Sequence, residues 1–183
     1  MAISLNGTTG ITTPDITSTT STLGALTQAL DLGSTGQVVF PATQNASANA
    51  NTLDDYEEGT WTGAIEVTGG SVTIGTNGGK YTKTGRVVTI SGSFTISSVS
   101  SPTGVVWLTG LPFAAGSGAT SDTAVALYFG MGVAITGTVI SVIRSGESRL
   151  FFQLQAPSDD LIYNIASSFN ADTVFSINAS YTV

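Results

Sequence analysis

The side chains best suited to chemistry form one acidic cluster. Four carboxylates fall within five consecutive residues, in the string Leu53-Asp-Asp-Tyr-Glu-Glu-Gly-Thr-Trp61. Paired carboxylates can catalyse glycoside hydrolysis, and several together can bind calcium through their oxygens. The alternating acidic positions and distal glutamate of a calcium loop are absent. We therefore predict a solvated junction between an N-terminal arm and the following domain, consisting of Asp54, Asp55, Tyr56, Glu57, Glu58 and Trp61.

Other catalytic groups are scarce. The chain has no histidine and no cysteine, which excludes a Ser-His-Asp arrangement, a thiol nucleophile and a zinc–thiolate site. The string Gly75-Thr-Asn-Gly-Gly-Lys80 has the glycines of a phosphate-binding loop, but its first glycine is misplaced. Tyr81 also stands where Ser or Thr would bind magnesium. We interpret this string as a hairpin turn and predict a protein that is not an enzyme and binds no cofactor or metal.

Two tryptophans are candidates for sugar binding. An aromatic ring can stack on the apolar face of a sugar, and both Trp61 and Trp107 could do so. Packing in a core is the alternative for either ring. If the protein recognises a surface glycan, we expect Trp107 and the loop residue Tyr163 to contact it.

Charge is scarce and unevenly placed. Charged residues make up 9% of the 183, against about a quarter in typical soluble domains. The net charge is −7, and no basic residue precedes Lys80. Nucleic-acid binding needs a basic surface that displaces counterions. We therefore expect no nucleic-acid partner.

One uncharged stretch is long enough to cross a membrane as a helix, namely residues 123–143. Gly130, Gly132 and Gly137 interrupt it, and its Val, Ile, Thr, Tyr and Phe residues favour strands. We predict two strands around a turn at Thr136–Gly137, and no membrane partner.

Residues 1–52 have no persistent hydrophobic period and cannot form a core of their own. Short apolar islands lie between turn-forming residues. A region of this kind is either disordered or bound to another surface, and the islands favour binding. We predict an extended attachment arm over residues 1–52, with attachment residues Ile3, Leu5, Ile11, Val38, Val39 and Phe40.

The sequence of residues 53–183 predicts a series of strands separated by turns. Apolar and polar residues alternate over 88–96 and again over 175–183, as in strands that bury one face. Turn signals at Thr76–Gly79 and Ser101–Pro102 separate further short candidates. We predict an all-β domain, an antiparallel β-sandwich or jelly-roll-like knob. Its outward residues are mostly Ser and Thr, without the charges that usually block edge pairing, so we expect other chains to cover part of its surface.

Four strings resemble structural proteins of tailed bacteriophages, a group of virion fibre, spike and head-decoration proteins commonly described as tail-fibre-like. They are Phe40-Pro-Ala-Thr-Gln44, the junction string continued from Asn51 to Thr62, Gly79-Lys-Tyr-Thr-Lys-Thr-Gly-Arg86 and Gly110-Leu-Pro-Phe113. The group commonly has proline after Trp-Thr, where this chain has Gly63. The resemblance covers residues 1 to about 113.

The resemblance implies a homotrimeric, β-rich knob on the exterior of a phage virion, attached by an N-terminal arm. Together with the missing catalytic side chains, it predicts a non-enzymatic structural protein. We favour a capsid-decorating (cement) knob or short head fibre whose partners are capsid proteins. The alternative is a tail fibre or tail-tip protein that recognises a host surface glycan.

Overall fold

The structure is a computed structural model that describes residues 36, 38–43, 49, 51–53, 55–118, 122–133, 137–155, 161–162 and 164–183. The chain divides into two compact units, residues 1–38 and 39–183, and nearly all described residues belong to the second. The predicted boundary between residues 52 and 53 stays a prediction. Among the described residues there are nine strands and one 3-10 turn, but no α-helix. The elements are β1 (Tyr56–Trp61), β2 (Ala64–Thr84), β3 (Val87–Thr109), β4 (Thr123–Ala124), β5 (Ala126–Val133), β6 (Thr138–Ile143), β7 (Arg149–Gln155), β8 (Leu161–Ile162), the 3-10 turn (Ala166–Ser168) and β9 (Phe169–Thr182).

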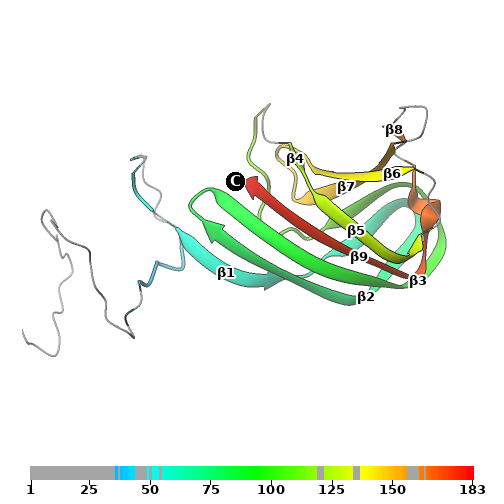
Figure 1. The fold of residues 1–183 in the computed structure, drawn as a ribbon, viewed down its shortest axis with the longest axis horizontal. Helices are drawn as coiled ribbons and strands as arrows, with labels where there is room; N and C mark the ends of the chain where they lie inside the picture. Colours follow the sequence, from blue (N-terminus) through cyan, green and yellow to red (C-terminus); the bar gives the residue numbers. More distant parts are fainter. Residues whose placement is uncertain are drawn as a thin grey trace, which may run out of the picture. The chain divides into compact units, whose positions relative to one another are not determined.

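A long antiparallel hairpin of β2 and β3 joins two layers (Figure 1). The first part of β3, Val87–Thr95, pairs with β9, whereas its last part, Val106–Thr109, pairs with β7. One layer therefore contains β1, β9 and β5, and the other contains β7, β6 and β4. We call them the β9 layer and the β7 layer. The prediction of an all-β, antiparallel sandwich is confirmed.

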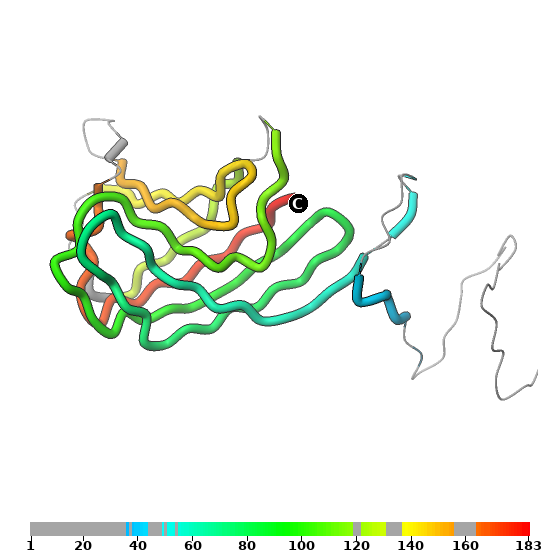
Figure 2. Tube along the Cα trace, turned by 180° about the vertical axis from the view of Figure 1, so that it is seen from behind, coloured from blue at the N-terminus to red at the C-terminus, as the bar shows by residue number. Residues whose placement is uncertain are grey.

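Bulges bend the hairpin where it passes between the layers. Register shifts lie between Val67 and Ser71 and between Thr73 and Thr76, and an extra residue in one strand makes the ladder bend. Gly70 has a φ of +74°, and a Cβ there would lie 2.2 Å from the carbonyl oxygen of Ser101. Only glycine is free of strain in this position. Figure 2 shows both strands curving over at one end of the sandwich.

The predicted hairpin turn at Gly75–Lys80 is wrong. These residues continue β2 as a strand, and the turn signal at Ser101–Pro102 lies inside β3. The β2–β3 pairing runs through Thr76–Lys80 and resumes on both sides of Ser101–Pro102, so the glycines lie within a strand and the proline lies at a bulge, and neither marks a chain reversal. The reversal occurs at Gly85, whose φ is +54°.

Alternating side chains of the two layers meet in an aromatic core. Phe94 of β3 stacks on Phe175 of β9, with ring centroids 5.1 Å apart. Phe152 of the β7 layer meets Phe175 edge to face at 5.6 Å, so the core spans both layers. Such contacts add to the stabilisation from burying the rings. The other fully buried large side chains are Phe169, Ile90, Ile96, Leu108, Ile143, Leu150, Ile165, Val88 and Val106.

The outward face of the β9 layer is rich in hydroxyls. Thr89 and Ser180 share a hydrogen bond of 2.9 Å, and Ser176 donates one of 3.2 Å to Ser93. At the edges of this layer, β1 carries Glu57 and Glu58, whereas β5 has no charged residue. Charge at an edge opposes pairing with another sheet, so β5 is the less protected edge.

The stretch considered as a membrane span, residues 123–143, contains β4, β5 and β6. In the described part of the chain, no helix has the length and apolar character needed to span a membrane. The two predicted strands are present, but they belong to different layers, because β5 pairs with β9 and β6 with β7.

Tyr181 connects β9 to the segment that follows β3. Its buried hydroxyl donates a 2.9 Å hydrogen bond to the carbonyl oxygen of Phe113, and burial raises the pKa of Tyr181 to about 12. An unfolded tyrosine has a pKa of about 10, so this stabilisation is complete below about pH 10 and is lost as the pH rises to about 12. We expect the melting temperature to fall less steeply over this window in Tyr181→Phe than in the parent. Identical pH dependence of the two proteins would contradict this assignment.

Candidate functional site

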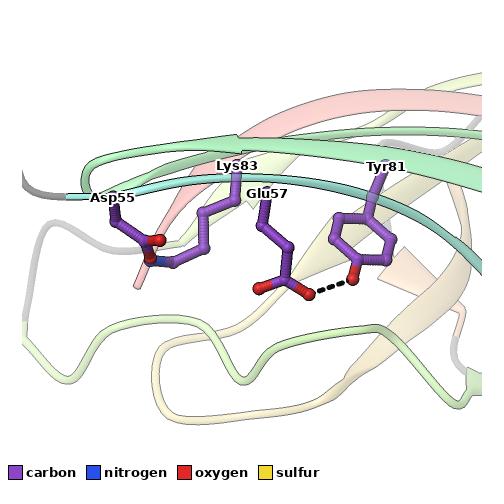
Figure 3. Close-up of polar contacts among 4 residues, drawn as sticks. All are labelled: Asp55, Glu57, Tyr81 and Lys83. Atoms are coloured by element: carbon purple, nitrogen blue, oxygen red, sulfur yellow. Dashed lines mark hydrogen bonds and ion pairs between the residues drawn. The ribbon is translucent and has the colours of Figure 1, made fainter. Parts of the chain in front are cut away.

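The predicted junction residues lie on and beside β1, an edge strand that pairs with Gly79–Thr84 of β2. Successive side chains of a strand point to opposite faces. Asp55 and Glu57 therefore lie on the same side of the sheet as Tyr81 and Lys83 of β2, as Figure 3 shows. Asp54 lies outside the described residues.

Asp55 and Lys83 form a buried ion pair. The two residues are only 7% and 4% exposed. The Asp55 carbonyl oxygen accepts a 2.9 Å hydrogen bond from the Gly85 N–H, and the Lys83 ammonium lies 5.6 Å from the centre of the Phe113 ring. At Asp55, the prediction of a solvated junction is therefore wrong, because β1 pairing places this carboxylate beside Lys83 and away from water.

The next two carboxylates each accept a hydrogen bond from a tyrosine. The Tyr81 hydroxyl donates to Glu57 and the Tyr56 hydroxyl donates to Glu58. Both glutamates are exposed. Each hydrogen bond raises the pKa of its phenol, because the bond is lost when the phenol ionises. These contacts orient the glutamates along the strand.

This arrangement does not provide paired acids. Glu57 and Glu58 are neighbours in a strand and point to opposite faces, while Asp55 is held by Lys83. Among the described residues, no three acidic side chains come together in a way that could hold a metal ion. What the residues can do is stabilise the point at which the chain enters the sandwich.

Trp61 at the end of β1 belongs to the core. Its indole N–H donates a 3.3 Å hydrogen bond to the Lys80 carbonyl oxygen, and its ring lies 5.4 Å from that of Phe94. A Cβ added to Gly79 would lie 2.3 Å from the indole. The missing side chain at this position therefore makes room for the tryptophan, and core packing accounts for its burial.

The predicted attachment residues are only partly described. Ile3, Leu5 and Ile11 lie outside the described residues. Val38 and Val39 are exposed, the latter to 87%. Phe40 is half-buried, with its ring 6.3 Å from that of Tyr56. The two valines present apolar surface that another molecule could cover.

Trp107 lies half-buried on the outer face of the β7 layer. The Arg149 guanidinium lies over its ring at 5.2 Å, and Phe151 meets it edge to face at 6.2 Å. The indole N–H is buried and has no hydrogen-bond partner among the described residues. The ring face under Arg149 is not open to a sugar, and Tyr163 lies outside the described residues. The predicted glycan contact through Trp107 stays a prediction.

Sequence reasoning missed a groove on the outer face of the β9 layer. It has a volume of about 630 Å³ and crosses β1, β2, β3 and β9. Its floor is the backbone of a row in which Trp61, Gly79, Gly92 and Ile177 pair across the sheet. The alternation of Ser and Thr with apolar residues was visible in the sequence, but only the register of four strands brings these hydroxyls together.

Comparison with known proteins finds no matching family model and no matching curated protein. Among solved structures, the chain is similar to the crystal structure of the Dettilon tailspike protein (gp208), with a TM-score of 0.61 and 18% sequence identity. The match covers 69% of this chain and 24% of the tailspike chain. The matched part of this chain thus shares its fold with about a quarter of the tailspike chain.

Proposed function

We propose that the chain is a non-enzymatic structural protein on the exterior of a bacteriophage particle. The observation that carries this proposal is the fold shared with part of a tailspike over 69% of the chain. The junction string from Leu53 to Trp61 adds to it through its resemblance to structural proteins of tailed phages. A structural role also suits the junction, where Asp55, Glu57 and Glu58 each have a stabilising partner.

Within this proposal, the sandwich forms a homotrimeric knob that decorates the capsid, and residues 1–52 attach it. Burial of exposed apolar surface contributes about 25 cal/mol per Å², and the exposed Val38 and Val39 can gain in this way. A trimer would present three arms, and linked weak attachments bind far more tightly than one alone.

The second candidate is a tail fibre or tail-tip protein that recognises a host surface glycan. The likeness to a tailspike favours this location. Electron cryo-microscopy of particles carrying a labelled form of the chain distinguishes the two candidates. Label on the capsid surface supports the first, and label at the tail supports the second.

Deleting residues 1–38 tests the attachment arm. Because residues 39–183 form a compact unit, we expect the truncated protein to keep the melting temperature of the full chain but to lose at least tenfold in affinity for particles that lack the protein. Co-sedimentation with such particles measures the loss. Val38→Ser with Val39→Ser in the full chain should weaken binding, whereas the neighbouring control Thr43→Ser should not. Full binding by the truncated protein would contradict the proposal.

A further inference from the structure

The groove on the outer face of the β9 layer has the lining of a carbohydrate site. Its exposed side chains are small or flexible: Thr60 of β1, Thr62 just after β1, Lys80 of β2, and Ser91 and Ser93 of β3. Ser176 of β9 completes the lining. Most of these groups are hydroxyls, which both donate and accept hydrogen bonds.

Two smaller hollows extend the groove and share Lys80 with it. One, of about 410 Å³, continues along β1 toward Glu58 and Thr82. The other, of about 130 Å³, continues toward Thr89 and Asn178. Three hollows that all border Lys80 offer adjacent subsites, which an oligosaccharide of several residues could fill.

The groove also offers apolar surface of the kind that sugar rings contact. Threonine methyl groups and glycine Cα atoms lie between the hydroxyls. Tyr128 of β5, 66% exposed, pairs with Ser176 at the side of the groove. A sugar has the same mixture of hydroxyls and C–H faces, and an aromatic ring packs on the latter.

The charged side chains around the groove indicate which class of ligand it can bind. Lys80 is exposed and forms no ion pair with any residue in the described part of the chain. Among the described residues it is the only cation that lines any of the three hollows, while Glu58 lines the hollow next to the groove. An ammonium group lying among hydroxyls is suited to the carboxylate of an acidic sugar.

We propose that this groove binds an oligosaccharide with a carboxylate-bearing sugar residue at Lys80. The groove is distinct from the Trp107 region. The choice of bacterial polysaccharides as ligands rests on the proposed virion role, whereas the groove itself is tested on the purified full chain, without a phage particle.

Gly78 allows the groove to be blocked without disturbing the fold. A Cβ added to Gly78 meets no atom within 4 Å, although the residue lines the groove. Gly78→Leu should therefore fill the groove with a side chain while leaving the core unchanged. Thr138→Leu, at an exposed position of β6 in the other layer, is the matched control for an added apolar side chain.

The test uses an array of bacterial surface polysaccharides, both neutral and uronic-acid-containing, with the affinity for each bound member measured by calorimetry. We expect the full chain to bind uronic-acid-containing members. Gly78→Leu and Lys80→Met should each weaken binding at least tenfold, Lys80→Arg should retain most of it, and Thr138→Leu should match the parent. Circular dichroism and melting temperature check that each variant is folded.

Other outcomes would overturn the inference. Binding to no member of the array, or unchanged binding by a folded Gly78→Leu variant, would rule out a glycan site in this groove. Equal affinity of the parent and of Lys80→Met for the uronic-acid-containing members would remove the role of the carboxylate. A change in oligomeric state of Gly78→Leu, measured by light scattering, would show that the face is a contact between copies of the chain.

Discussion

Replacing Asp55 with alanine is expected to lower the free energy of unfolding by about 3–5 kcal/mol, the usual effect of removing one partner from a buried ion pair. The reason is that Lys83 is 4% exposed and its ammonium group would be left buried without the carboxylate that pairs with it. The Phe113 ring at 5.6 Å compensates only in part, because a cation–π contact contributes about 0.5–2 kcal/mol. Urea-induced unfolding of the full chain measures the loss.

A neighbouring acid supplies the control for this prediction. Glu57→Ala removes an exposed carboxylate whose only described contact is the Tyr81 hydroxyl, and we expect it to cost less than about 1 kcal/mol. The double variant Asp55→Ala with Lys83→Met should recover much of the stability, because no buried charge is then left unpaired. If Asp55→Ala lowered the free energy of unfolding no more than Glu57→Ala does, a buried Asp55–Lys83 pair would be contradicted.

Asp55→Ala should also loosen β1, the strand that joins the arm to the sandwich. β1 is an edge strand and pairs on one side only, with β2. Asp55 directly precedes the first residue of β1, and both its ion pair with Lys83 and the hydrogen bond that it accepts from Gly85 lie at this end of the strand. Local opening of such a strand appears in hydrogen exchange before global unfolding. We expect faster exchange over β1 in Asp55→Ala while β9 stays protected.

The alternating patterns of β3 and β9 were sufficient to predict an antiparallel sandwich from the sequence. The path of β2 was not predictable in the same way. Glycine-rich segments usually mark turns, but Gly75–Lys80 lies in a strand because β3 pairs with it along its length. Whether a glycine reverses the chain or bends a strand depends on a partner that is far away in the sequence.

The junction illustrates a related limit. The sequence places four acids together, which suggests a shared site, yet strand alternation separates Glu57 from Glu58. Lys83, the partner of Asp55, is 28 residues away, and only the β1–β2 register brings it close. The composition of the site was therefore visible in the sequence, whereas its pairings required the topology.

Gly63 is a position where a single substitution should be poorly tolerated. It connects β1 to β2 and is buried between the two layers. Its N–H donates a 2.9 Å hydrogen bond to the side-chain oxygen of Asn77, and its carbonyl oxygen accepts one from the same amide group. A Cβ at this position would lie 2.7 Å from Leu108 and 3.1 Å from Phe94.

We expect Gly63→Pro to lower the free energy of unfolding by more than 3 kcal/mol or to prevent folding. Proline removes the N–H that donates a hydrogen bond to Asn77, and its ring enters space that Leu108 fills. Gly63→Ala keeps the hydrogen bond and adds only the clash. We therefore expect it to lower the free energy of unfolding by about 1–3 kcal/mol, as in other overpacked cores. Urea-induced unfolding compares both with Gly78→Ala, whose added methyl group meets open space. A cost for Gly63→Ala no larger than for Gly78→Ala would contradict the packing argument.

A double-variant cycle separates the loss of the hydrogen bond to Asn77 from the clash with Leu108. In an Asn77→Ala background the Gly63 N–H has already lost its side-chain acceptor, so proline should cost less there than in the parent, and the difference measures the hydrogen bond. Equal costs of Gly63→Pro in both backgrounds would show that the clash with Leu108 alone requires glycine here.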